Sequence, residues 1–182
     1  MTGTQPIAFF DRDGTLVNCD VRDGTPVPTH GIVELVEGAA EACERLRSLG
    51  FLLVMVTNQP DVARGTGDRE TVERANEQIA ELLGLDLALA CMHDDLDRCV
   101  CRKPRPGLLL EAARQLDVDL DRTSVIIGDR WRDIDAGIAA GVATVLIDRG
   151  YGELRTSQPD YIARDLISAV DWIGAHLTRS RT

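Results

Sequence analysis

Three things are scarce in this sequence, and each scarcity narrows what the chain can be. No apolar run approaches the roughly 18 residues that a membrane-spanning helix needs, which argues against a protein that crosses a membrane. Residues 1–6 contain neither a basic nor an apolar stretch, so we expect no secretory signal and a cytoplasmic location. Lysine is almost missing. Of 20 basic residues only Lys103 is a lysine, which marks that position as a candidate for a specific role.

The chain is acidic and of moderate length. Its 30 acidic and 20 basic residues give a net charge of −10, which makes nucleic acid and anionic membranes poor partners. The 182 residues suffice for one domain with a full hydrophobic core, and no repeat, low-complexity tract or linker divides them. We therefore expect a monomer with a single domain over residues 1–182.

Short apolar runs alternate along the chain with segments of helical periodicity. Strands are expected at 7–10, 52–56, 87–90, 124–127 and 142–147, with an edge strand at 161–163. Helices are expected at 39–49, about 69–83, around 109–116, 134–140 and 166–177. This alternation predicts an α/β fold with a central, mainly parallel sheet covered by helices on both faces.

The longest loop-like segment, residues 18–31, is too short to form a separate domain. We interpret it as a flap beside the active site and expect no cap domain anywhere in the chain.

Polar side chains stand where the expected strands end. Asp11 and Asp13 follow the first strand, Thr57 and Asn58 the second, and Asp129 the strand at 124–127. Ligands of open parallel sheets bind beyond the carboxyl ends of the strands. We therefore expect these side chains to converge on one rim.

The converging carboxylates suit phosphate chemistry. Asp11, Asp13 and Asp129 offer the hard oxygen ligands that Mg²⁺ prefers. One carboxylate can attack phosphorus to form an aspartyl phosphate, and another can protonate the leaving oxygen. Thr57, Asn58 and Lys103 can neutralise charge on the transferring phosphoryl group.

Together these pieces resemble the four-motif signature of the haloacid dehalogenase superfamily. The matching residues are Asp-Arg-Asp-Gly-Thr at 11–15, then Thr57, then Lys103, then Gly-Asp at 128–129 with Asp133. The resemblance spans about residues 7–148, which we take as the catalytic core.

The resemblance implies a Rossmann-like core and assigns roles to its residues. Asp11 would be the nucleophile, and Asp13 the general acid and then the general base. Mg²⁺ would be bound by Asp11, Asp129 and the backbone carbonyl of Asp13.

A second constellation lies at residues 91–101. Cys91, His93, Cys99 and Cys101 form a Cys₃His set of the kind that holds a structural zinc ion in tetrahedral geometry. All four positions are filled, so no open position for a catalytic water is expected. A redox pair is the alternative, although Cys-x-Cys with a nearby histidine is not a thioredoxin-like spacing.

This zinc loop, with Cys-Arg-Lys-Pro at 101–104, resembles the zinc-bearing subgroup of the superfamily that acts on heptose bisphosphates and histidinol phosphate. Asn-Gln at 58–59 and Ala-Arg-Gly at 63–65 favour the heptose branch. By this resemblance Arg102 and Arg130 would contact the substrate beyond the transferred phosphate. Two features depart from the heptose branch: the spacer inside the zinc loop is shorter, and Arg130 replaces a lysine.

The substrate is expected to be a small phosphorylated metabolite. Arg102, Arg130 and Arg64 provide cations at the rim, and guanidinium groups suit a second phosphate. A D-glycero-D-manno-heptose 1,7-bisphosphate fits best. The alternatives are histidinol phosphate, another sugar phosphate or, from a different class, an inert zinc-containing binding protein.

Several residues keep open roles at this point. Asp133 either holds the site or caps the helix that follows, and Arg64 is either a solvated loop residue or part of the rim. Cys43 is expected in the core, Cys19 receives no role, and His30 and His176 are expected at the surface.

Overall fold

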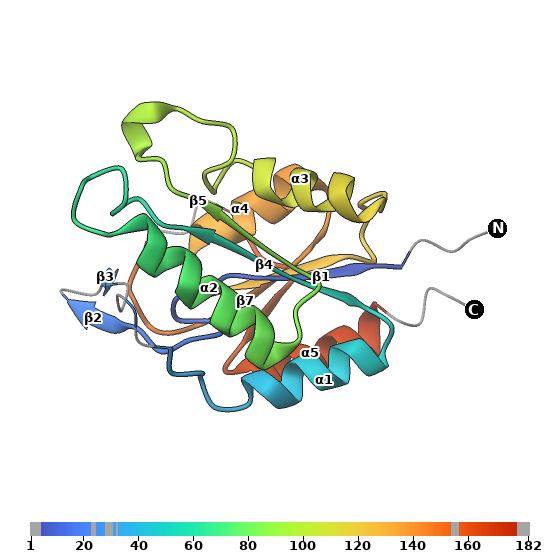
Figure 1. Cartoon of the computed structure of the whole chain (residues 1–182). Helices are drawn as coiled ribbons and strands as arrows, with labels where there is room; N and C mark the ends of the chain where they lie inside the picture. The colour runs from blue at the N-terminus through green and yellow to red at the C-terminus, as the bar shows by residue number, and fades with distance from the viewer. Residues whose placement is uncertain (1–4, 23–24, 28–30, 32, 154–156, 178–182) are drawn as a thin grey trace.

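Six parallel strands form the central sheet, in the order β5-β4-β1-β6-β7-β8 (Figure 1). The structure is a computed structural model that describes residues 5–22, 25–27, 31, 33–153 and 157–177. The strands are β1 (Ile7–Phe10), β4 (Leu52–Asn58), β5 (Leu87–Cys91), β6 (Val125–Gly128), β7 (Ala143–Ile147) and β8 (Tyr161–Ala163). The chain runs outward from β1 in one direction through β4 and β5, and in the other through β6, β7 and β8. This reversal beside β1 is where an open α/β sheet forms its ligand crevice.

Helices cover both faces of the sheet. They are α1 (Ala39–Ser48), α2 (Arg69–Leu83), α3 (Gly107–Leu116), α4 (Trp131–Ala140) and α5 (Leu166–His176). Ala8 and Phe10 of β1 pack with apolar side chains of α1, α2 and α5, whereas Ile7 and Phe9 pack with those of α3 and α4. The side chains of a strand alternate between the two faces of its sheet, so one strand supplies both cores. The expected three-layer α/β arrangement is confirmed.

Most expected elements lie within one or two residues of their places. The largest shift is in α4, which begins at Trp131 rather than Ile134. The Asp133 carboxylate accepts a hydrogen bond from the backbone N–H of Arg130 (3.1 Å), which satisfies a donor at the start of the helix. The observed helix is therefore nearly one turn longer at its N-terminus than the predicted one. Gly84 ends α2 as expected, in the left-handed conformation with φ 61°.

Two short features were not predicted. The segment expected as a loop at 18–31 contains the antiparallel pair β2 (Asp20–Arg22) and β3 (Thr25–Val27). A single 3₁₀ turn, η1 (Asp95–Asp97), lies inside the zinc loop. The expectation for His30 falls outside the described residues, whereas Cys43 is buried in the core and His176 is exposed, both as expected.

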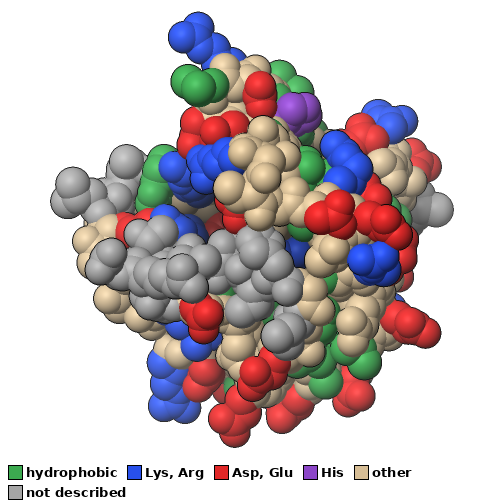
Figure 2. Space-filling model, turned by 60° about the vertical axis from the view of Figure 1, so that its left-hand side comes forward, with side chains coloured by type: hydrophobic (Ala, Val, Ile, Leu, Met, Phe, Trp, Pro, Cys, Tyr) green, Lys and Arg blue, Asp and Glu red, His purple; other side chains and the backbone are tan. Residues whose placement is uncertain are grey.

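The described helices include none that is long and apolar enough to cross a membrane. Figure 2 shows acidic and basic side chains intermingled on the face it presents. Among the described residues in that view there is no continuous basic stripe of the kind that binds a nucleic acid backbone.

Candidate active site and metal centre

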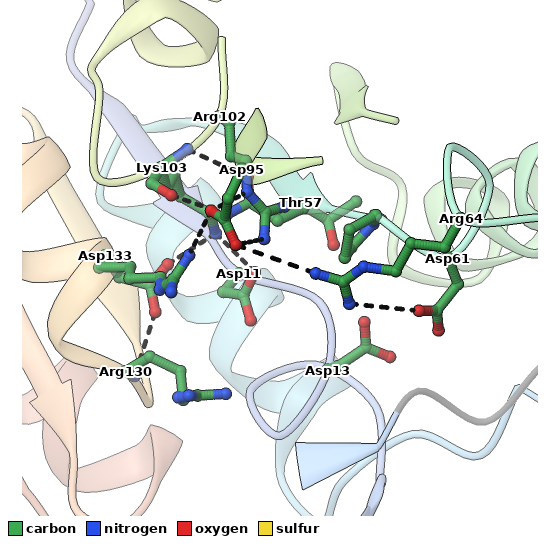
Figure 3. A pocket seen from close by; sticks show the side chains of 13 residues that line it. Asp11, Asp13, Thr57, Asp61, Arg64, Asp95, Arg102, Lys103, Arg130 and Asp133 are labelled. Atoms are coloured by element: carbon green, nitrogen blue, oxygen red, sulfur yellow. Dashed lines mark hydrogen bonds and ion pairs between the residues drawn. The ribbon is translucent and has the colours of Figure 1, made fainter. Parts of the chain in front are cut away.

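A pocket of about 390 Å³ opens at the carboxyl edge of the sheet (Figure 3). Its walls come from the loops after β1, β4, β5 and β6. The lining residues are Asp11, Asp13, Thr57, Asn58, Pro60, Asp61, Arg64, Asp95, Arg102, Lys103, Arg130, Arg132 and Asp133. All seven side chains predicted for catalysis or phosphate binding therefore meet in one cavity.

Lys103 is buried at the base of this pocket, with its side chain only 2% exposed. Its Nζ donates to Asp11 Oδ1 at 2.6 Å and to the carbonyl of Val56 at 2.7 Å, and lies 2.6 Å from Asp133 Oδ1. Burial alone would lower the pKa of Lys103, but the charges of Asp11 and Asp133 outweigh it and raise the pKa. The ammonium group therefore stays charged beside Asp11.

Asp133 has both of the roles that the sequence left open, because it holds a site residue and caps the helix that follows. One oxygen pairs with Lys103 and the other accepts from the backbone of Arg130 at the start of α4. Burial raises the pKa of Asp133 to about 6, against the opposing effect of the Lys103 charge. Both oxygens are engaged by the protein, so Asp133 serves as the anchor for Lys103.

Asp129 is buried and only partly satisfied. Its Oδ2 accepts from the Tyr151 hydroxyl at 2.8 Å, while its Oδ1 is buried with no hydrogen-bond partner. Burial, followed by the charges of Asp11 and Asp133, raises the pKa of Asp129 well above its usual value. Carboxylate oxygens of Asp11, Asp129 and Asp133 lie within 4.8 Å of one another. An orphan oxygen in a crowded acidic cluster is what a divalent cation would satisfy.

Gly14 allows the loop after β1 to reach Asp129. Its φ is +81°, and a Cβ at this position would lie 2.0 Å from Asp129 Oδ2. Only glycine combines that backbone conformation with so close an approach. The loop that carries Asp11 and Asp13 is thereby held against Asp129.

Asp13 lies in a setting suited to a proton donor. Its carboxylate accepts from Gln59 Nε2 at 2.7 Å and from Arg12 Nε at 3.1 Å. Burial raises the pKa of Asp13, the Arg12 charge opposes that rise, and the Asp11 charge adds to it. A carboxyl group with a raised pKa retains a proton more readily near neutral pH.

Thr57 and Asn58 end β4 in different settings. Thr57 is buried and its hydroxyl accepts from Gln59 Nε2 at 3.0 Å. The Asn58 side chain binds the backbone of Lys103 twice, accepting from its N–H at 3.0 Å and donating to its carbonyl at 2.9 Å. Asn58 thus positions Lys103, and direct contact of Asn58 with phosphate stays a prediction.

The rim arginines already have carboxylate partners. Arg102 Nε donates to Asp95 at 2.8 Å, and Arg64 holds Asp94 with two bonds of 2.6 and 3.1 Å. Arg130 pairs with Glu153. The sequence predicted the cations of this rim but not the acids that balance them. Arg64, which the sequence left open, lines the pocket.

The four predicted zinc ligands come together at the end of β5. Cys101 Sγ lies 3.3 Å from Cys91 Sγ, 3.4 Å from Cys99 Sγ and 3.3 Å from His93 Nδ1. A tetrahedral ion with bonds of about 2.3 Å to sulfur would separate its sulfur ligands by about 3.8 Å. All four ligand atoms lie within 4.8 Å of one another, so the set fits one zinc ion.

The chain has relatives among known proteins. A family model described as HAD-hydrolase-like matches residues 100–169. A D-glycero-beta-D-manno-heptose-1,7-bisphosphate 7-phosphatase of Yersinia pestis is 34% identical, covering 95% of this chain and 92% of the relative. A D-glycero-D-manno-heptose-1,7-bisphosphate 7-phosphatase of Thermosynechococcus vestitus is also 34% identical, covering 95% and 97%. The chain belongs to this heptose-bisphosphate phosphatase family.

A solved member of the family shows the same fold. The D,D-heptose 1,7-bisphosphate phosphatase of B. bronchiseptica, crystallised with magnesium and phosphate, superposes with a TM-score of 0.76 at 28% identity. The match covers 93% of this chain and 98% of that one. Membership of the haloacid dehalogenase superfamily, and of its phosphatases, is therefore confirmed.

Four residues of the site were not predicted from the sequence. Gln59 bonds Asp13, Tyr151 bonds Asp129, and Arg132 and Asp95 line the pocket and pair with each other at 3.3 Å. Gln59 and Tyr151 carried a usable signal, because each follows a parallel strand at its carboxyl end. Asp95 and Arg132 also follow the carboxyl ends of parallel strands, β5 and β6, but their pairing depends on how the η1 turn packs against the start of α4.

Proposed function

We propose that the chain is a magnesium-dependent phosphomonoesterase that forms an aspartyl phosphate on Asp11. The observation that supports this most is the buried Lys103 ammonium, held 2.6 Å from Asp11 in the pocket that Asp13 also lines. A carboxylate beside a fixed cation can approach a phosphate dianion that it would otherwise repel.

In the proposed first step, Asp11 attacks phosphorus and the bond from phosphorus to the leaving oxygen breaks. Asp13 donates its proton to that oxygen, so the product leaves as a neutral alcohol. Lys103 and the Thr57 hydroxyl stabilise charge on the phosphoryl oxygens. In the second step Asp13 takes a proton from water, which attacks the aspartyl phosphate and releases inorganic phosphate.

The residues present fit a magnesium ion. The orphan Asp129 Oδ1, the Asp11 carboxylate and the backbone carbonyl of Asp13 would hold it. When bound, Mg²⁺ supplies positive charge to the phosphoryl oxygens and offsets the repulsion between Asp11 and Asp129. Asp133 is not needed as a ligand, because Lys103 and the start of α4 occupy its oxygens.

Cys91, His93, Cys99 and Cys101 would hold a structural zinc ion that shapes residues 91–101. Arg102 and Lys103 follow the last ligand directly, and the Cys91 carbonyl accepts from the backbone N–H of Gln59 at 2.7 Å. The zinc loop would therefore position both sides of the pocket. We assign the whole chain to one phosphatase domain without a cap.

The proposed substrate is a D-glycero-D-manno-heptose 1,7-bisphosphate, and this rests on the relatives named above. A test is to incubate the protein with Mg²⁺ and this bisphosphate, measure phosphate release, and identify by ³¹P NMR which phosphate is lost. Histidinol phosphate and a hexose 6-phosphate serve as comparison substrates, and Asp11→Asn as the inactive control. The substrate assignment is wrong if histidinol phosphate has the highest kcat/KM of the three.

A further inference from the structure

Asp95 is a carboxylate of the pocket that has no part in the proposed phosphoryl transfer. Asp95 lies on η1 in the zinc loop, and its side chain is 56% exposed within the pocket (Figure 3). Three guanidinium groups surround it, from the loop after β4, the end of the zinc loop and the first turn of α4. Arg102 Nε lies 2.8 Å, Arg132 Nη1 3.3 Å and Arg64 Nη2 3.9 Å from its oxygens.

The Asp95 carboxylate lies among the three arginines where a bound anion would lie. Guanidinium groups that converge on one point repel each other unless an anion lies between them. The pocket is lined by five acidic and five basic residues, so its lining carries no excess of positive charge. A second phosphate on a substrate would have to share the arginines with Asp95 or replace it.

The arginines have other anchors and do not depend on Asp95 for their places. Arg64 keeps its two bonds to Asp94, and Arg102 Nη1 reaches the carbonyl of His93 at 3.4 Å. Arg132 lies over the Trp131 ring at 5.2 Å from its centroid. Removing the Asp95 charge would therefore leave the three cations in position but without their shared anion.

We propose that Asp95 is a specificity-determining residue that occupies the arginine cluster as a substitute anion and is displaced by the second anionic group of a substrate. This rests on the proposed function, and it adds how a neutral pocket selects a doubly phosphorylated substrate. A monophosphate leaves the Asp95 ion pairs intact. The second phosphate of a bisphosphate, which carries up to two negative charges, replaces Asp95 in these ion pairs and binds the arginines more strongly.

The test compares Asp95→Asn with wild type on two ligands, a hexose 1,6-bisphosphate and the matching hexose 6-phosphate. Dissociation constants are measured by calorimetry, and kcat/KM by phosphate release. Removing the competing charge should tighten binding of the bisphosphate by about fivefold and leave the monophosphate unchanged, since an exposed charge pair contributes about that much. Zinc content and melting temperature verify that the variant is folded, and Asp95→Ser serves as a second variant.

Asp97→Asn is the matched control, because it makes the same charge change two residues away on an exposed side chain that does not line the pocket. The Asp97 carboxylate accepts from the backbone N–H of Asp94 at 2.7 Å, and the asparagine carbonyl oxygen can accept the same bond. Weaker bisphosphate binding in Asp95→Asn would show that Asp95 only positions the arginines. An equal change for both ligands, or the same effect in Asp97→Asn, would also overturn the proposal. The dissociation constants decide this even if the protein hydrolyses neither hexose phosphate. The proposed function is tested separately, by phosphate release from the heptose bisphosphate.

Discussion

At the scale of a single residue, Lys103 shows how a buried charge is compensated by its partners. A buried ammonium loses its hydration, and that loss is compensated only by well-placed partners. Lys103 has three, namely Asp11, Asp133 and the carbonyl of Val56. Asp133 and Val56 would keep the ammonium in place while Asp11 reacts. Lys103 can therefore serve the phosphoryl group without the fold depending on its bond to Asp11.

That redundancy yields a prediction for Asp11→Asn. An amide cannot form the acyl phosphate, so turnover should fall by about 10³-fold or more. Asp13→Asn should also lose turnover, through loss of the proton donor. Melting temperature and zinc content should stay near those of wild type in Asp11→Asn. Phosphate release and calorimetry measure these, with Asp20→Asn, an exposed residue outside the pocket, as the matched control. Comparable turnover in Asp11→Asn and wild type would disprove the mechanism.

Tyr151 is predicted to orient Asp129 rather than to react. Its hydroxyl donates to Asp129 Oδ2 at 2.8 Å, which leaves Oδ1 for a cation. Tyr151→Phe should raise the Mg²⁺ concentration needed for half-maximal activity by about 10-fold, the scale seen when partners of metal ligands are removed. The value of kcat at saturating Mg²⁺ should change little. Tyr161→Phe makes the same change on β8 and should leave the Mg²⁺ dependence unaltered. Loss of kcat without a shift in Mg²⁺ dependence would contradict this role.

At the scale of elements, much of the site followed from the positions of strands. Asp11, Thr57 and Asp129 were placed together because parallel strands end at one edge of a sheet, whatever the details of packing. The pairing of Asp95 with Arg132, 37 residues apart, could not be predicted in that way. It depends on how the η1 turn packs against the first turn of α4, which neither periodicity nor spacing describes.

The start of α4 illustrates the same limit. From the sequence, capping a helix and holding the site are alternative roles for Asp133. Its two oxygens serve both purposes, and this became visible only when Lys103, 30 positions earlier in the chain, was brought against it. Sequence patterns describe contacts within one element, whereas the Asp133 carboxylate also binds Lys103 in a distant segment.

Loss of zinc from residues 91–101 should affect both the stability and the activity of the protein. Cys99→Ser takes away one of four ligands, and because metal binding contributes to folding, it should lower the free energy of unfolding by several kcal/mol. Activity should fall indirectly, through disorder of the segment that leads to Arg102 and Lys103. Elemental analysis, calorimetry and phosphate release measure the three effects. The control is Cys43→Ala, a substitution in the core on α1; this variant should retain zinc. Full zinc occupancy in Cys99→Ser would show that the four residues do not act as one site.

At the scale of the whole molecule, the proposed magnesium site should couple stability to pH. The folded state forces Asp11, Asp129 and Asp133 together, with burial as the main cause of the raised pKa of Asp129. A carboxyl group whose pKa is raised on folding makes the folded protein less stable once the pH exceeds that pKa, because the charged form is then buried. A divalent cation would relieve this cost, and only in the deprotonated form.

Mg²⁺ should therefore stabilise the protein more at high pH than at low pH. As the pH falls through the raised pKa of Asp129, a proton occupies the carboxyl group and competes with the cation. The increase in melting temperature on adding Mg²⁺ should then shrink. The measurement is the melting temperature with and without Mg²⁺ at a series of pH values. Zinc content is measured at each pH, and only pH values at which zinc is retained are compared. In Asp129→Asn the Mg²⁺ effect should be small at every pH. A stabilisation by Mg²⁺ that stays constant, or grows as the pH falls, would show that Asp129 does not bind the ion.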